Sequence, residues 1–219
     1  MNEAQSKAIL ARHGVPIPLA RVVHGGEEAA AAAGELGYPV VLKALGVAHK
    51  TEAGGVRLGL DSAEAVSAAV TEMSSLCESF LIEKMVEGAL AELIVGVARD
   101  EQFGPYLLVG GGGTLVELMK DRVALLLPTT TDQVLHALHQ LKIAPLFKGF
   151  RGSPPADLMA AADAILAVAG LVQKDPLSIV ELDINPLILL AEGRGVVAAD
   201  ALIRQSTPSN LDPGTGPER

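Results

Sequence analysis

Three oxygen-bearing side chains lie at alternate positions in a long apolar run. They are Glu181, Asp183 and Asn185, with Leu182 and Ile184 between them. Because alternate residues of a β-strand point to the same side, we expect the three polar side chains to share one face. Two acids and an amide on a buried strand are costly unless a positive charge meets them, and Mg²⁺ takes hard oxygen ligands. From this spacing alone, a magnesium site and a solvated strand face both remain open.

A third acid is brought close to this stretch by an expected hairpin. Residues 192–195 (EGRG) favour a tight turn, and the strand that returns over residues 196–199 ends at Asp200. Because the two strands would be antiparallel, Asn185 and Asp200 can converge on one cation. This favours the magnesium site over a solvated strand face.

Residues suited to binding phosphate occur earlier in the chain. Lys43 ends the apolar strand expected over residues 38–43. A buried lysine is rare unless it is paired, so a rigid strand could place Lys43 as a phosphate ligand. The alternative is that its ammonium group reaches water at the edge of the strand.

The loop over residues 46–55 carries a second set of polar residues. His49 precedes Lys50 and Thr51, and the pair Gly54 and Gly55 permits the close backbone approach that phosphate loops require. Because imidazole is a nucleophile at neutral pH, His49 could carry a phosphoryl group while its neighbours hold the phosphate. The alternative is an exposed loop histidine.

The elements that must position these residues predict an α+β fold with two lobes. Helices and strands alternate over the first part of the chain, and consecutive strands with a helical insert follow. We expect lobes at residues 1–88 and 89–205, with a hinge near residues 86–90, and a disordered tail over residues 206–219. At such a hinge, backbone groups at the end of the strand over residues 82–86 could read an adenine ring, and Glu92 could hold a ribose hydroxyl. Surface glutamates are the alternative.

Composition excludes several classes of function. The chain has 219 residues, a net charge of −9 and no cluster of Lys and Arg, which argues against nucleic acid as a partner. Cys77 is the single cysteine, so no intrachain disulfide can form. No signal peptide is apparent, and no stretch reaches the roughly 20 apolar residues of a membrane span. These features predict a cytoplasmic protein without membrane contact.

A series of short motifs follows in order along residues 3–204. The motifs are 38–43 (YPVVLK), 49–56 (HKTEAGGV), 82–86 (IEKMV), 92–100 (ELIVGVARD), 110–117 (GGGGTLVE), 148–152 (KGFRG) and 181–187 (ELDINPL), before Asp200. In this order they resemble the ATP-grasp superfamily, and within it the β subunits of ADP-forming acyl-CoA (acetyl-CoA) synthetases. The ordered set is specific, although no single motif is decisive.

The resemblance implies an ATP-grasp fold that clamps ATP or ADP between two lobes. The implied roles are phosphate contact for Lys43, adenine and ribose contacts for Glu83, Val86 and Glu92, Mg²⁺ binding for Asn185, Asp200 and Asp183, and a phosphoryl relay through His49. In such synthetases a histidine of a partner is phosphorylated first, and the overall reaction converts acyl-CoA, ADP and phosphate into carboxylic acid, CoA and ATP.

The resemblance also implies a partner. The chain lacks a CoA-binding module, so we expect a CoA-binding α subunit or a fused domain, and a hetero-oligomer. Two alternatives remain open at this point. One is a different ATP-grasp carboxylate ligase, such as a β subunit like that of succinyl-CoA synthetase, and the other is a non-catalytic ATP-grasp regulatory domain.

Overall fold

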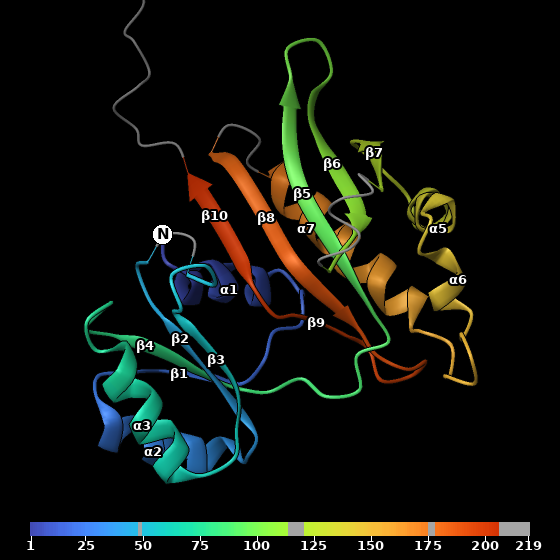
Figure 1. Ribbon diagram of the computed structural model, residues 1–219. Coiled ribbons are helices and arrows are strands. Elements are labelled where there is room, and N and C mark those ends of the chain that lie inside the picture. The colour runs from blue at the N-terminus through green and yellow to red at the C-terminus, as the bar shows by residue number, and fades with distance from the viewer. Residues whose placement is uncertain (48–49, 114–120, 175–177, 206–219) are drawn as a thin grey trace, which may run out of the picture.

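The computed structural model describes residues 1–47, 50–113, 121–174 and 178–205, which form two lobes around two antiparallel sheets (Figure 1). The helices are α1 (Glu3–Arg12), α2 (Gly26–Leu36), α3 (Ala63–Met73), α5 (Thr131–Gln140), α6 (Ala144–Phe147) and α7 (Leu158–Lys174). The strands are β1 (Ala20–Val23), β2 (Val40–Ala44), β3 (Val56–Leu60), β4 (Phe80–Lys84), β5 (Ala91–Asp100), β6 (Gly104–Gly111), β7 (Arg122–Leu126), β8 (Ile179–Leu189), β9 (Val196–Ala198) and β10 (Ala201–Gln205).

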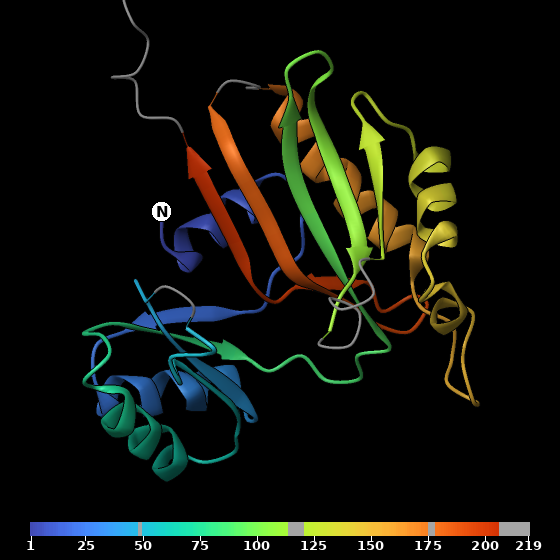
Figure 2. The ribbon, with the colours of Figure 1, turned by 45° about the horizontal axis from the view of Figure 1, so that its top comes forward.

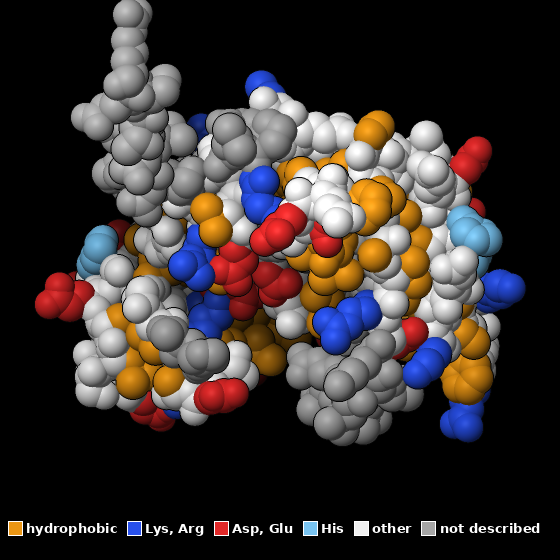
Figure 3. Space-filling model, turned by 90° about the horizontal axis from the view of Figure 1, so that it is seen from above, with side chains coloured by type: hydrophobic (Ala, Val, Ile, Leu, Met, Phe, Trp, Pro, Cys, Tyr) orange, Lys and Arg blue, Asp and Glu red, His pale blue; other side chains and the backbone are white. Residues whose placement is uncertain are grey.

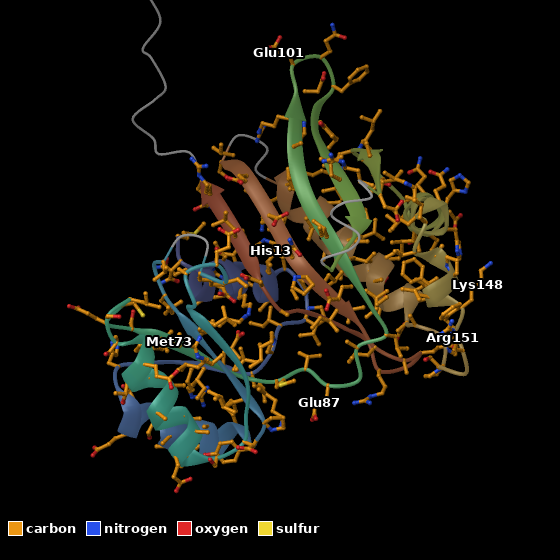
Figure 4. All side chains as sticks on the ribbon, in the orientation of Figure 1. His13, Met73, Glu87, Glu101, Lys148 and Arg151 are labelled. Carbon is orange, nitrogen blue, oxygen red and sulfur yellow. The ribbon has the colours of Figure 1, made fainter. Side chains whose placement is uncertain are left out.

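The smaller lobe is a four-stranded sheet, in the order β1-β4-β2-β3, covered on one face by α2 and α3. The side chain of Ser62 accepts a hydrogen bond from the N–H of Ala65 and so caps the start of α3. Val66, Val70 and Met73 then recur on one side of that helix and are buried against the sheet. Met73 points from α3 into this interface (Figure 4).

The larger lobe is a six-stranded sheet in the order β10-β8-β5-β6-β7, with β9 paired to β8. Helices α1 and α7 lie on the same side of this sheet, and none of the described helices lies on the opposite side of β8 and β5 (Figure 2). Leu182 and Ile184 of β8 are each 1% exposed and belong to the core on the helical side. The expected alternation along this strand is therefore present.

Helix α1 begins the chain but packs on the second sheet. Asn2 and Gln5 cap each other's backbone N–H groups in a capping box, which fixes where the helix starts. The hydroxyl of Ser6 accepts a hydrogen bond of 3.0 Å from the N–H of Ile203 on β10, and Leu10 joins the core of the larger lobe. The first turn of α1 is thereby held where the two lobes meet.

The chain passes from one sheet to the other between Lys84 and Ala91. Glu87 lies on this connection and points away from both lobes (Figure 4). The predicted lobe boundary after residue 88 falls here and stays a prediction, and the predicted tail over residues 206–219 lies outside the described residues. In the part of the chain that the structure describes, no helix is both long and apolar enough to cross a membrane.

Candidate functional site

A cavity of about 680 Å³ lies where the two lobes face each other. Seen from above, acidic and basic side chains gather next to one another in the middle of the molecule (Figure 3). The cavity is lined by the start of the chain, the segment that follows β2, and the facing parts of β8 and β10. Its lining residues are Met1, Asn2, Glu3, Ala44, Leu45, Gly46, Val47, Lys50, Thr51, Asp183, Asn185, Asp200, Ala201 and Leu202.

The three residues expected to hold a metal ion line this one cavity. Asp200 sits between β9 and β10, and β10 pairs with β8 so that Ala201 lies opposite Ile184. The N–H of Asn185 donates a hydrogen bond of 3.2 Å to the carbonyl oxygen of Asp200. Asn185 and Asp200 are therefore neighbours, and Asp183 lies two residues along β8 on the same face.

The charge of this face suits a cation. Burial, and then the carboxylates of Asp200 and Glu181, raise the pKa of Asp183 to about 6. Among the described residues no group of three or more His, Cys, Asp or Glu side chains could hold a metal ion, so the amide oxygen of Asn185 and water would have to complete the donor set. Two carboxylates and an amide fit Mg²⁺, which takes hard oxygen ligands and retains water. Glu181 instead pairs with Arg204 at 2.9 Å on the exposed part of the sheet.

Beside Asp183, Asn185 and Asp200 lies a group of ion-paired side chains, which we call the lysine–carboxylate cluster. The cluster consists of Glu3, Lys7, Lys43, Lys50, Glu83 and Asp200. Lys43 Nζ lies 2.8 Å from Glu3 Oε1, 2.7 Å from Glu83 Oε2 and 2.6 Å from the carbonyl oxygen of Ala199. Lys50 contacts Glu3 and lies 2.7 Å from Asp200 Oδ2. The cluster thus joins both lobes.

Burial and charge act against each other within the cluster. Burial alone would raise the pKa of Glu3, but the ammonium groups of Lys43, Lys7 and Lys50 lower it to about 2. Burial lowers the pKa of Lys43, yet the carboxylates of Glu3, Glu83 and Asp200 outweigh it and raise that pKa above its ordinary value. Both groups therefore carry full charge at neutral pH. The pKa of Lys7 is lowered by burial and by the neighbouring ammonium group of Lys43.

The residues predicted to bind phosphate are partly brought together. Lys50 and Thr51 line the cavity, and Lys43 lies in the cluster beside them. Gly54 has a φ of +72°, and a Cβ on Gly55 would lie 3.0 Å from the carbonyl oxygen of Lys50, so both positions suit glycine. His49 lies outside the described residues.

None of the three residues predicted to contact adenine and ribose, Glu83, Val86 and Glu92, lines this cavity. Glu83 is 1% exposed, and its carboxylate lies 2.6 Å from Lys7 Nζ within the cluster. Glu92, on β5, packs against the glycine segment that follows β6, where a Cβ on Gly112 would meet the backbone of Glu92 at 3.1 Å. Val86 is half-buried on the connection between the sheets. Their roles in binding nucleotide stay predictions.

Glu3 and Lys7 are site residues that sequence reasoning missed. A Glu and a Lys four positions apart on a helix usually form an exposed pair, whereas here Glu3 is 8% and Lys7 is 2% exposed. A signal was present, because positions 3, 6, 7 and 10 share one helix face and Leu10 makes that face the buried one.

Comparisons with known proteins agree with this architecture. A family model described as an ATP-grasp domain matches residues 1–204. The β subunit of an ADP-forming acetate–CoA ligase I from Pyrococcus furiosus is 34% identical over 209 residues, with 91% of this chain and 89% of that protein covered. A trans-feruloyl-CoA synthase from an unknown prokaryotic organism is 39% identical over 213 residues, which cover 92% of this chain but 30% of that protein. This chain therefore spans less than a third of that longer relative.

A solved structure extends the likeness to three dimensions. It is the dinucleotide-forming acetyl-coenzyme A synthetase 1 of Ca. Korarchaeum cryptofilum in complex with coenzyme A and Mg-AMPPCP, with a phosphohistidine segment that points towards the nucleotide-binding site. The two chains superpose with a TM-score of 0.81 and 34% identity, covering 93% of this chain and 92% of that one. The expected ATP-grasp fold is thereby confirmed.

Proposed function

Because this chain belongs to the ATP-grasp domain family, and within it to the β subunits of ADP-forming acetate–CoA ligases, we propose that it is the nucleotide-binding part of an ADP-forming acyl-CoA synthetase. The reaction of the complete enzyme is acyl-CoA + ADP + phosphate ⇌ carboxylic acid + CoA + ATP. This chain is assigned the half of the reaction in which a phosphoryl group moves between a histidine and ADP or ATP.

The observation that supports this proposal most directly is that lysine ammonium groups and oxygen atoms suited to binding a metal ion come together at one cavity between the lobes. Lys50 of the smaller lobe lines the cavity, with Lys43 beside it in the lysine–carboxylate cluster, and Asp183, Asn185 and Asp200 line it from the larger lobe. A nucleoside diphosphate with a divalent cation needs positive side chains for its phosphates and oxygen donors for its metal. The region between the lobes brings both sets together, since Lys50 and Asp200 are in direct contact there.

We assign the metal role to Asn185 and Asp200, with Asp183 beside them. A Mg²⁺ ion held there would neutralise charge on the phosphates during transfer. Lys43 and Lys50 are assigned to the phosphate oxygens, with Thr51 and the backbone at Gly54 and Gly55 completing the loop. Glu83, Val86 and Glu92 keep their predicted places around adenine and ribose.

His49 is assigned the relay step. One ring nitrogen of His49 attacks the phosphorus of a phosphohistidine on the partner; the new P–N bond forms as the old one breaks, and the electron pair of the old bond returns to the partner's imidazole. His49 gives up its ring N–H proton and the partner's imidazole gains one. An oxygen of the ADP β-phosphate then attacks the same phosphorus, and His49 recovers its electron pair and a proton.

The proposed partner is a CoA-binding α subunit or a fused CoA-binding domain. The relative from Pyrococcus furiosus is a separate β subunit of similar length, whereas the feruloyl-CoA synthase contains the matching region within a longer chain. Either arrangement supplies the CoA site and the first phosphohistidine, and a hetero-oligomer in the cytoplasm is the setting that we propose for a free subunit.

Exchange of label between ADP and ATP, with the partner and MgCl₂ present, tests this function. The protein should catalyse the exchange and carry acid-labile phosphate on His49 after incubation with the partner and acetyl phosphate. His49→Asn should still bind ADP but lose at least about a thousandfold in exchange rate. An unaltered rate in His49→Asn would contradict the relay, and the absence of exchange in the native protein would favour a regulatory domain.

A further inference from the structure

Glu3 makes contacts with all three lysines of the lysine–carboxylate cluster. Its Oε1 lies 2.8 Å from Lys43 Nζ and 2.9 Å from Lys7 Nζ, and its Oε2 contacts Lys50 Nζ. These lysines come from α1, from β2 and from the loop between β2 and β3. One carboxylate therefore fixes the separation of two ammonium groups, those of Lys43 and Lys50, that belong to different segments of the smaller lobe.

The position of this carboxylate is itself fixed by the larger lobe. Glu3 is the first residue of α1, whose start is set by the capping box of Asn2 and Gln5. The Ser6 hydroxyl ties the next turn to Ile203 of β10. Because Glu3 is nearly buried, its side chain has little freedom to follow the lysines if they move. Lys43 and Lys50, which belong to the smaller lobe, are therefore held to a fixed point on the larger lobe.

Lys50 depends on Glu3 more than the other two lysines do. Lys7 and Lys43 each have a second carboxylate, Glu83, at 2.6 and 2.7 Å, and each donates to the carbonyl oxygen of Ala199. Among the described residues, the carboxylate partners of Lys50 are Glu3 and Asp200. Asp200 is also a proposed metal ligand, and a carboxylate that turns to a cation weakens its bond to Lys50. Glu3 is then the acid that still holds Lys50.

We propose that Glu3 is a positioning residue of the nucleotide site, which holds the Lys43 and Lys50 ammonium groups in place to receive the phosphates of ADP or ATP. This inference rests on the proposed function. The cluster contains three ammonium groups and three carboxylates, so their charges balance. When a nucleotide binds with its cation, the ion pair between Lys50 and Asp200 breaks. Lys50 then contacts a phosphate oxygen and Asp200 binds the cation. Glu3 keeps its ion pairs with the lysines.

Glu3 could affect nucleotide binding through its negative charge or through the position that it gives to the lysines, and these two roles predict opposite results. If Glu3 acted only as a negative charge near the phosphates, its removal would make the site more positive and would tighten binding. A positioning role predicts the opposite, because Lys50 without Glu3 loses its fixed place. Glu3→Gln keeps the shape and removes the charge, whereas Glu3→Asp keeps the charge and withdraws the carboxylate by one methylene group. Both variants should bind ADP more weakly.

The test is a double-mutant cycle on the dissociation constant of ADP, measured by calorimetry with MgCl₂. Glu3→Gln and Lys50→Met should each weaken ADP binding by about ten- to hundredfold. The loss in the double variant should fall well short of the product of the two single losses, because Glu3 acts mainly through Lys50. Glu27→Gln is the matched control, since Glu27 is also in the first turn of a helix but is exposed, and it should bind ADP like the native protein.

The possible results of the cycle distinguish a positioning role of Glu3 from an effect of its charge, and from a failure of the proposed function. Losses that add in the double variant, or an unchanged or tighter dissociation constant in Glu3→Gln, overturn the positioning role. If Glu3→Gln does not fold, as judged by circular dichroism, Glu3→Asp takes its place in the cycle, and native-like ADP binding by Glu3→Asp overturns the proposal. A native protein that does not bind ADP would instead contradict the proposed function.

Discussion

At the scale of single residues, the site is a place where charges are buried in compensating pairs. Removing one partner of such a pair leaves an uncompensated charge, which costs about 3–5 kcal/mol. Glu83 illustrates the difficulty for sequence reasoning, because a strand glutamate carries no mark of the lysines that will face it. Its partners Lys7 and Lys43 are 76 and 40 residues away in the chain. Only the fold brings these three residues together.

Asp183 gives a prediction at this scale. The pKa of its carboxyl is about 6 in the folded protein against 3.8 for the ordinary group, so the ionised form destabilises the metal-free fold above that range. Asp183→Asn should therefore raise the free energy of unfolding at pH 8, and the gain should shrink as the pH falls from about 6 towards 3.8. Urea denaturation at pH 8, 6 and 4.5 measures this difference.

The control for this prediction is Asp163→Asn, which removes an exposed acid from α7. It should change the free energy of unfolding little at pH 8. If the native protein and Asp183→Asn had equal free energies of unfolding at pH 8, the ionised carboxylate of Asp183 would not destabilise the fold, and the prediction would be wrong. Added MgCl₂ should narrow the gap, because the cation binds the native carboxylate.

At the scale of elements, local patterns predicted the strands that carry site residues, which the structure shows as β2, β8 and β9. The alternation over Glu181, Leu182, Asp183 and Ile184 predicted both faces of β8 because that strand is buried on one side. Strand β10 was not predicted, although Ala201 and Ile203 are buried and Leu202 and Arg204 are exposed. Its five residues follow a turn and precede a polar tail, so the alternation is too short to stand out.

The glycine segment that ends β6 gives a prediction at the scale of elements. A Cβ on Gly110 would lie 2.7 Å from the carbonyl oxygen of Asp121, which is backbone and cannot turn aside. Gly110→Ala should therefore lower the free energy of unfolding by about 1–3 kcal/mol. The measurement is urea denaturation of the purified protein.

Gly170→Ala is the matched control, because Gly170 lies within α7 and a Cβ there meets nothing within 4 Å. In a helix interior this change should raise the free energy of unfolding by about 0.5–1 kcal/mol. If Gly110→Ala also stabilised the protein, the close approach of β6 to residue 121 would be wrong.

At the scale of the whole molecule, the two lobes meet through the connection between β4 and β5 and through the lysine–carboxylate cluster. Helix α1 carries two members of that cluster and packs on the larger lobe, so the first residues of the chain complete a site whose other parts come from the middle and the end. The order of motifs along the chain predicted the two-lobed family. It could not show that α1 closes the site, because that depends on packing between elements distant in sequence.

The central claim is that the cavity between the lobes receives the phosphates and the cation of a nucleotide. A crystal structure of the protein with ADP and MgCl₂ tests it most directly. We predict that phosphate oxygens lie within hydrogen-bond distance of Lys43 and Lys50, that Mg²⁺ is bound by Asn185 and Asp200, and that Lys50 keeps its contact with Glu3 while losing that with Asp200. A nucleotide bound away from this cavity, or phosphates in it with the Lys50–Asp200 ion pair unbroken, would contradict the account.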